Sequence, residues 1–228
     1  MNATKILPSG RKQSRILVVD DHPAIRYGMA RWLEEQPDLA ICGEAGNASQ
    51  ALAAVGELKP ELVLADLTMP GGEGLEFIKD MRALHQDVAV LVVSMHDEEL
   101  YAERALRAGA RGYIMKNEGG GKLVEAIRLV LQGKIYLSEK MSGRALEIFS
   151  GVRQREDNAS LGKLTDREFE VFQLIGQGLT MREIGDRLHL SMKTVETHRL
   201  HIREKMEIKS GPTLTQYAVR WAGLQSLI

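Results

Sequence analysis

The chain of 228 residues contains a single cysteine, Cys42, so an intrachain disulfide bond cannot form. Its longest purely aliphatic run, residues 88–93, is far too short to span a membrane. The first 15 residues lack a continuous apolar stretch of secretory length. These absences predict a soluble cytoplasmic protein with no membrane partner.

The sequence also lacks a strong excess of charge of either sign. Its formal net charge is −1, which gives no global sign of a polyanionic partner. The charge balance is local, because residues 161–228 carry 10 Lys and Arg against 8 Asp and Glu, whereas residues 1–138 carry 16 against 19. A mildly basic C-terminal third is compatible with nucleic-acid binding but does not establish it.

Residues 15–137 alternate between strand patterns and helix patterns. Continuous apolar runs predict strands at residues 15–20, 61–66 and 88–93, and residues 39–43 and 112–115 predict two shorter strands. Helical spacing of apolar residues predicts helices near residues 24–35, 47–58, 73–84, 98–108 and 121–132. Strict alternation implies parallel strands joined by right-handed crossovers, and hence a doubly wound, five-stranded parallel sheet of flavodoxin-like α/β type.

The rest of the chain has a different character. Residues 1–14 are polar and predict a disordered lead-in. Residues 138–160 predict a linker, in which residues 139–149 could form a short helix before a Gly, Ser and Asn-rich stretch. Residues 161–228 show only helix signatures, which predict a small all-α domain.

Polar residues at the ends of the predicted strands are the main clue to function. Asp20 with Asp21, then Asp66, Ser94 and Lys116, each follow the carboxyl end of a different strand. In a parallel sheet these ends share one edge, where such folds bind their ligands. Each residue alone is common beside a loop, but their joint placement favours a site. Asp66, held rigidly after a buried strand and before the Pro-Gly-Gly turn at residues 70–72, is the predicted acceptor of a phosphoryl group.

The acidic residues at this edge predict a bound cation. Clustered carboxylates repel one another unless a cation lies between them, so Asp20, Asp21 and Asp66 predict a divalent ion. Oxygen ligands that leave room for a phosphate favour Mg²⁺. Lys116 can pair with one phosphoryl oxygen, and the Ser94 hydroxyl can hydrogen-bond to another.

These motifs resemble the receiver domain of two-component response regulators. The matching stretches are VVDDH, LADLTMP, VVSMHD and GYIMK, in the order and rough spacing of that family. The resemblance implies that Asp66 takes its phosphate from a phosphohistidine of a sensor histidine kinase. It implies that Asp21, Asp66 and the backbone carbonyl of Thr68 ligate Mg²⁺, with Asp20 assisting.

The same resemblance implies a switch. Ser94 would move toward the phosphate, and Tyr113 would turn inward to fill the space. The sequence departs from many receivers at Asn117, where they have a proline directly after the lysine. A cis-proline at that position is therefore excluded.

The C-terminal third carries a helix-turn-helix pattern. Residues 180–188 predict one helix, residues 189–190 a tight turn and residues 191–206 a second, longer helix. The second helix would enter the major groove of DNA. Capping boxes at residues 165–168 and 180–183 mark helix starts.

The helical wheel of residues 192–206 predicts which side chains face DNA. Val195, Ile202 and Met206 share the core side, so the opposite face carries the base-reading candidates. The candidates for reading bases are Lys193, Glu196, Thr197 and Leu200. The candidates for phosphate contacts are Arg199, Arg203 and Lys205, and the predicted DNA contacts also include Thr180, Thr194 and His198. For His198, a structural role in helix packing competes with base contact.

This segment, LTDREFEVFQLIGQGLTMREIGDRL and SMKTVETHRLHIREKM, resembles the LuxR-type helix-turn-helix. Several relatives have lysine where Glu196 and Leu200 stand, so the operator sequence stays open. In such proteins the last helix, here near residues 213–224, pairs two copies on DNA. Its apolar stripe could do so, or could belong to the core of the domain; the stripe consists of Leu214, Tyr217, Ala218 and Trp221.

Both resemblances together imply a response regulator of the NarL/FixJ type. Such a protein is a transcriptional regulator, not an enzyme, and binds promoter half-sites of double-stranded DNA as a homodimer on activation. RNA polymerase is a further candidate partner. A phosphoaspartate hydrolase resembling haloacid dehalogenases is the first alternative, but it needs a second carboxylate where this chain has Thr68. A regulator whose DNA binding depends on protein contacts alone is the second.

Overall fold

The structure is a computed structural model that describes residues 13–69, 74–143 and 161–225. The chain divides into two compact units, Met1–Ala145 and Leu146–Ile228. Residues 1–12 of the predicted lead-in, the predicted turn at residues 70–72 and residues 144–160 of the predicted linker lie outside the described residues.

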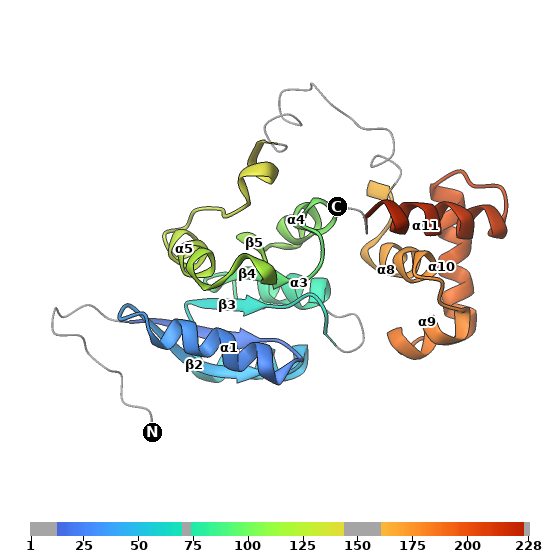
Figure 1. The fold of residues 1–228 in the computed structure, drawn as a ribbon. Coiled ribbons are helices and arrows are strands. Elements are labelled where there is room, and N and C mark those ends of the chain that lie inside the picture. Colours follow the sequence, from blue (N-terminus) through green and yellow to red (C-terminus); the bar gives the residue numbers. More distant parts are fainter. Residues whose placement is uncertain (1–12, 70–73, 144–160, 226–228) are drawn as a thin grey trace. The chain divides into compact units, whose positions relative to one another are not determined.

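The first unit is built on a five-stranded sheet (Figure 1). Its strands are β1 (Ser14–Val19), β2 (Leu39–Ala45), β3 (Leu62–Ala65), β4 (Ala89–Ser94) and β5 (Gly112–Met115). They run in the order β2-β1-β3-β4-β5, and every neighbouring pair is parallel. The predicted doubly wound, five-stranded parallel sheet is confirmed.

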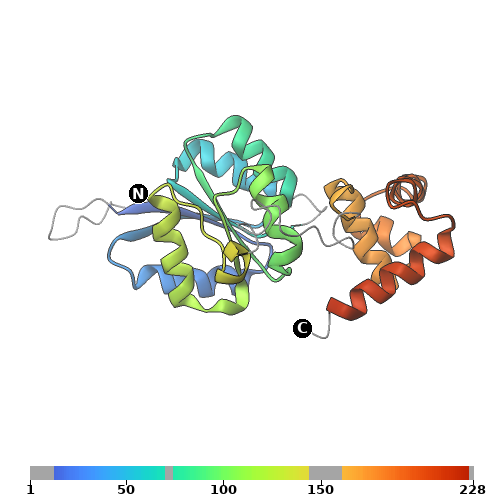
Figure 2. The same ribbon diagram turned by 90° about the horizontal axis from the view of Figure 1, so that it is seen from above.

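Helices cover both faces of this sheet. They are α1 (Pro23–Glu34), α2 (Ala48–Leu58), α3 (Gly74–Leu84), α4 (Glu98–Ala108) and α5 (Gly120–Leu131). Figure 2 shows α1 and α5 on one face and α2, α3 and α4 on the other. Because both faces are covered, the strands are aliphatic on both sides, which explains the continuous apolar runs in the sequence.

The register of the strands decides which residues meet at the edge of the sheet. Val19 pairs with Ala65, so Asp20 and Asp66 follow at the same level. Ala65 pairs with Val92, and Ser94 pairs with Met115, which precedes Lys116. The carboxyl ends of β1, β3, β4 and β5 therefore meet at one edge, as predicted.

The segment after α5 packs back onto the first unit. Tyr136 forms a parallel bridge with Gly112, and its carbonyl oxygen accepts a hydrogen bond of 3.0 Å from the Tyr113 N–H. Residues 139–143 are helical, which covers the described part of the short helix predicted at residues 139–149. The Ser138 hydroxyl hydrogen-bonds to the buried Glu98 carboxylate at the start of α4.

The described part of the second unit is helical. Its helices are α8 (Asp166–Gly176), α9 (Met181–Leu188), α10 (Met192–Lys205) and α11 (Gly211–Gln225). Both predicted capping boxes are present, at the starts of α8 and α9. Among the described residues, no helix combines the length and the apolar character needed to cross a membrane.

The last helix packs against α8 inside its own domain. Leu214 and Ala218 are fully buried. The Trp221 ring lies with its centroid 5.2 Å from that of Phe172, and the Tyr217 ring 6.0 Å from it. Leu214 and Ala218 of the apolar stripe therefore belong to the core of the domain, while Tyr217 and Trp221 are half-buried, and pairing of two copies through α11 stays a prediction.

Candidate functional site

Three charged side chains meet at the carboxyl edge of the sheet. Asp66 directly follows β3 and is only 2% exposed. The Lys116 ammonium group lies 2.8 Å from Oδ2 of Asp66 and 2.6 Å from Oδ2 of Asp20. Residues 50 positions apart in the sequence thus form a buried arrangement in which one cation joins two carboxylates.

Burial and pairing act against each other in this cluster. Burial raises the pKa of the Asp66 carboxyl, and the hydrogen bond from Lys116 offsets part of that rise. For Lys116, burial lowers the pKa, but the hydrogen bonds to Asp20 and Asp66 outweigh it and leave the pKa raised. Lys116 is therefore a stable cation at neutral pH, placed to neutralise negative charge on whatever binds beside Asp66.

The same edge carries a cluster of residues that could hold a metal ion. Asp20, Asp21, His22 and Asp66 each offer one ligand atom, and these atoms lie within 4.8 Å of one another. Within the described residues, Oδ1 of Asp66 is buried and has no hydrogen-bond partner. A buried carboxylate oxygen without a partner is costly, so this donor set fits a hard cation such as Mg²⁺.

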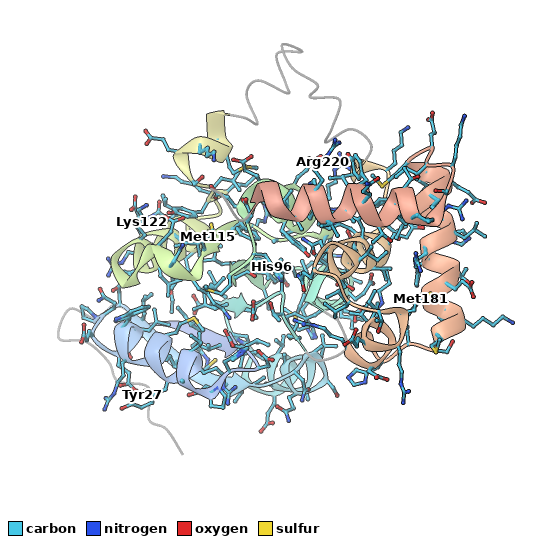
Figure 3. All side chains as sticks on the ribbon, turned by 45° about the vertical axis from the view of Figure 1, so that its right-hand side comes forward. Tyr27, His96, Met115, Lys122, Met181 and Arg220 are labelled. Carbon is cyan, nitrogen blue, oxygen red and sulfur yellow. The ribbon has the colours of Figure 1, made fainter. Side chains whose placement is uncertain are left out.

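Ser94 and Tyr113 meet through the loop that follows β4. Ser94 is fully buried, and its Oγ accepts a 3.2 Å hydrogen bond from the His96 N–H. Tyr113 is also fully buried, its hydroxyl donates to the His96 carbonyl oxygen at 2.9 Å, and burial raises its pKa. The His96 ring (labelled in Figure 3) stacks on Tyr101 of α4, and its Nε2 lies 3.2 Å from the Thr68 hydroxyl. His96 thereby connects the loop after Asp66 with β5 and α4.

Two loops around the site have distinct backbone requirements. A Cβ added at Gly74 would lie 2.3 Å from the carbonyl oxygen of Leu67, so only glycine allows the start of α3 to approach the loop after Asp66 this closely. After β5, residues Lys116–Glu118 form a single 3-10 turn, and no peptide bond of the described residues is cis. With Asn117 in this turn, Lys116 still reaches both carboxylates.

In the second unit, α9 and α10 are joined by a tight turn. His189 takes the left-handed conformation with φ +53°, and the Leu190 N–H donates to the carbonyl oxygen of Gly185 at 2.8 Å. The Ser191 side chain caps α10 by accepting from the Thr194 N–H. Val195 and Ile202 are fully buried and direct one side of α10 into the domain. In a helix-turn-helix the second helix packs one side against its domain and presents the other side to the major groove of DNA.

Comparison with known proteins decides the family. Residues 16–128 match the family described as response regulator receiver domain, and residues 162–218 match bacterial regulatory proteins of the luxR family. The chain is 34% identical over 210 residues to the oxygen regulatory protein NreC of Staphylococcus carnosus, covering 90% of this chain and 97% of that protein. The chain belongs to the response regulators of the LuxR type. Over 207 residues this response regulator is 38% identical to the response regulator GacA of Pseudomonas syringae, covering 90% and 95% of the two chains.

Solved structures agree with the fold of this response regulator. A LuxR-family two-component response regulator from Aurantimonas superposes with a TM-score of 0.57 at 34% identity, over 61% of this chain and 99% of the other. RcsB of Salmonella enterica, in a structure bound to the promoter rprA in the presence of phosphomimetic BeF3−, superposes with a TM-score of 0.63 at 22% identity, over 91% and 99%.

The structure brings the predicted acceptor-site residues of the receiver together. Asp20, Asp66 and Lys116 touch, while Ser94 lies at the end of the neighbouring strand. Asp21 belongs to the acidic cluster, with its side chain 28% exposed. Tyr113 already points inward, toward the His96 backbone. The roles of these residues, and of the Thr68 carbonyl as a ligand, stay predictions.

The predicted DNA contacts fall into two groups. The first is exposed on the outward side of α10 or near its start, and consists of Lys193, Glu196, Thr197 and Leu200, with Thr180 at the start of α9. The Thr180 side chain caps α9 and the Thr194 hydroxyl bonds to Ser191, so both also hold helix starts.

The second group is engaged within the domain. Lys205 donates to the buried Glu168 of α8 at 2.6 Å, and Arg203 donates to the carbonyl oxygen of Lys209 at 2.8 Å. His198 is half-buried, and burial lowers its pKa, with Glu168 opposing that shift. Arg199 lies against Gly211. These positions give the side chains intradomain packing partners, while their contact with DNA stays a prediction.

Sequence reasoning missed two histidines at the receiver site. The ring Nδ1 of His22 lies 2.5 Å from Oδ1 of Asp21, and the backbone N–H of His22 donates to Oδ1 of Asp20 at 2.9 Å. His96 makes the contacts with Thr68, Tyr101 and Tyr113 given above. Each is adjacent in sequence to a predicted site residue or two positions from it, and that proximity was the available signal.

Proposed function

We propose that this response regulator is a transcription regulator in which phosphorylation of Asp66 controls DNA binding by α10. One observation carries the proposal. A buried aspartate at the end of β3 has Lys116 2.8 Å away and lies in the same chain as a helix-turn-helix. The first arrangement suits a phosphoryl acceptor, and the second suits a DNA reader.

The chemistry asks little of the protein beyond positioning and charge. A carboxylate oxygen of Asp66 attacks the phosphorus of a phosphohistidine on a sensor histidine kinase, and the P–N bond breaks as the electron pair returns to the imidazole. Lys116 then pairs with a phosphoryl oxygen, and the Ser94 hydroxyl donates to another. A magnesium ion held by Asp21, Asp66 and the Thr68 carbonyl, with Asp20 assisting, would offset the charge of the phosphoryl oxygens.

The contacts of Ser94 suggest how the modification is sensed. Its Oγ accepts from the His96 N–H, and the His96 carbonyl accepts from the Tyr113 hydroxyl. If Ser94 turns toward a phosphoryl group, the loop at His96 and the start of α4 at Glu98 must adjust. Phosphorylation can shift DNA affinity only by its differential preference for the two receiver conformations.

The relatives supply the partners of the proposal. RcsB structures are described as bound to promoter DNA with a phosphomimetic, and as two dimers bound to two parallel DNAs. By analogy, this cytoplasmic regulator would bind double-stranded promoter half-sites as a homodimer when phosphorylated, with RNA polymerase as a candidate partner. We propose no catalytic turnover beyond slow loss of phosphate from Asp66, because Thr68 stands where a phosphoaspartate hydrolase of the dehalogenase type needs a carboxylate.

The test compares wild type and Asp66→Asn, each with and without acetyl phosphate and Mg²⁺, in gel shifts on DNA selected by the wild-type protein in both states. Acetyl phosphate should tighten binding by wild type on the order of 5–150-fold, a typical coupling between two sites. Asp66→Asn should not respond, whereas Asp80→Asn, which changes an exposed aspartate of α3, should respond like wild type.

Equal binding in all lanes would remove the switch. If mass spectrometry showed phosphate on Asp66 and DNA binding stayed unchanged, DNA binding would depend on protein contacts alone. Steady hydrolysis of a phosphomonoester would instead favour the enzyme alternative.

A further inference from the structure

The outward side of α10 carries an unusual set of side chains for a surface that meets DNA. Because Val195 and Ile202 are buried, the positions opposite them face away from the domain. The exposed residues on this side of the N-terminal half are Lys193, Glu196, Thr197 and Leu200. Only one of the four is a cation, so attraction to phosphate contributes little here.

Glu196 limits which bases can lie opposite it. Its side chain is exposed, and among the described residues it has no hydrogen bond or ion pair. A carboxylate accepts hydrogen bonds and cannot donate them. In the major groove only the amino groups of cytosine and adenine donate, and adenine adds an acceptor beside its amino group. Cytosine is therefore the base that fits Glu196 best.

Leu200 limits the choice of base in a different way. It is 47% exposed although it is large and apolar. Thymine is the base that presents a methyl group in the major groove. Leu200 lies four residues after Glu196, about 6 Å along the helix axis. Since bases of one strand are spaced by about 3.4 Å, the two side chains reach bases one or two steps apart.

Thr197 between them is partly committed. Its hydroxyl donates to the Lys193 carbonyl oxygen at 3.0 Å, so it offers DNA a methyl group and an acceptor. Thr197 therefore offers no donor to guanine, and Lys193 is the side chain of the four that can donate to it. Glu196 and Leu200 are the two whose chemistry favours cytosine and thymine.

We propose that Glu196 and Leu200 set the operator sequence of this regulator. Glu196 accepts a hydrogen bond from the N4 amino group of a cytosine, and Leu200 contacts the C5 methyl group of a thymine one or two base steps away. The proposal rests on the proposed function, because it requires α10 to lie in the major groove.

The experiment uses the full-length protein, treated with acetyl phosphate and Mg²⁺, to select sequences from a random double-stranded DNA library. Wild type should enrich a motif containing a cytosine and a nearby thymine. Glu196→Gln should shift the cytosine to adenine, because a glutamine amide pairs with N6 and N7 of adenine. Leu200→Ala should lose the thymine preference. Glu204→Gln, an exposed acid on the same side near the end of α10, should enrich the wild-type motif.

Affinity measurements on the selected DNA sharpen the test. Replacing the cytosine–guanine pair should weaken DNA binding by wild type on the order of tenfold. Glu196→Gln should show no preference for cytosine at this position. Replacing thymine by deoxyuridine should weaken wild type about fourfold, the effect of one buried methyl group, and should not affect Leu200→Ala. Circular dichroism checks that each variant is folded.

Several outcomes would overturn the proposal. If Glu196→Gln binds every sequence more tightly without a change of motif, Glu196 faces a phosphate. If deoxyuridine binds wild type as well as thymine does, Leu200 does not contact the methyl group. If wild type enriches a motif that neither variant changes, only this proposal fails. If wild type enriches no motif with or without acetyl phosphate, the proposed function fails with it.

Discussion

The Lys116 ammonium group joins two buried carboxylates, and its removal tests the geometry of the acceptor site. In Lys116→Met the side chain keeps most of its length and loses its charge. Asp20 and Asp66 would then share the edge of the sheet without the cation between them. We expect the first unit to lose stability, with the largest loss in magnesium-free buffer.

The size of this loss follows from distance and burial. With an effective dielectric constant of about 20, opposite unit charges 2.8 Å apart attract by about 6 kcal/mol before the cost of desolvation. Desolvation cancels much of that gain, yet removal of one partner from a buried pair costs about 3–5 kcal/mol. Domains are stable by about 5–15 kcal/mol, so the variant should stay folded. With a denaturant slope of about 2 kcal/mol per molar, the urea midpoint should fall by about 2 M.

Tryptophan fluorescence can follow the first unit alone. The chain has two tryptophans, and in a Trp221→Phe background Trp32 of α1, which packs against Gly120, is the remaining reporter. Millimolar Mg²⁺ should recover part of the stability lost in Lys116→Met, because the cation offsets the repulsion between the Asp20 and Asp66 carboxylates. Lys122→Met is the matched control, since Lys122 (labelled in Figure 3) pairs with Glu118 on the surface and water screens that pair. An unchanged midpoint for Lys116→Met in magnesium-free buffer would refute the reasoning.

Three further predictions concern single groups in both units. Burial lowers the pKa of His198 from its ordinary 6.5, so the folded domain favours the neutral ring and should lose stability as the pH falls below that value. Urea titrations of the second unit at pH 7.5 and 5.5 measure this. Gly74→Ala would bring a Cβ to 2.3 Å from the Leu67 carbonyl oxygen, so we expect a lower melting temperature and slower labelling by acetyl phosphate. Ser138→Ala deprives the buried Glu98 of its hydroxyl partner and should cost about 1–3 kcal/mol of unfolding free energy in urea.

Each of these three has a matched control. His198→Gln should flatten the pH dependence and the exposed His189→Asn should not; the reverse pattern would assign the effect to another group. Gly56→Ala in α2 meets nothing within 4 Å and should stabilise by about 0.5–1 kcal/mol, so equal effects at both glycines would contradict the close approach. Ser142→Ala changes an exposed hydroxyl, and a similar loss there would deny Ser138 a specific role.

Much of the fold followed from the sequence because a strand covered on both faces leaves a continuous aliphatic run. These runs and the two shorter strand patterns gave all five strands within about two residues, and the helix predicted near residues 47–58 is α2, which the Asn47 side chain caps. The start of α11 differed. The last helix, predicted near residues 213–224, begins at Gly211, because the Ser210 hydroxyl accepts from the Thr213 N–H and Pro212 fits the first turn. A proline pattern alone does not distinguish a break from a helix start.

The acceptor site was predictable as a set of residues but not as a set of contacts. Strand ends place Asp20, Asp66, Ser94 and Lys116 on one edge whatever the side chains do. That Lys116 bridges both carboxylates depends on the short turn after β5, for which the sequence has no periodic signal. A lone histidine in a loop carries no pattern either, so the position of His96 among three elements required coordinates.

The flanks of α10 show where a helical wheel stops being informative. Lys205 lies roughly perpendicular to the core direction on the wheel, and so does Arg203, so a long side chain there can turn toward DNA or toward the domain. The direction is decided elsewhere in the chain. Glu168 caps α8 by accepting from the Thr165 N–H, remains buried, and offers the same oxygen to Lys205 at 2.6 Å. These hydrogen bonds outweigh the effect of burial and lower the pKa of Glu168, so its charge persists and Lys205 is drawn inward. The capping box at the start of α8 is a local sequence pattern, but through Glu168 it also decides that Lys205 of α10 is held within the domain and is less available to a phosphate backbone.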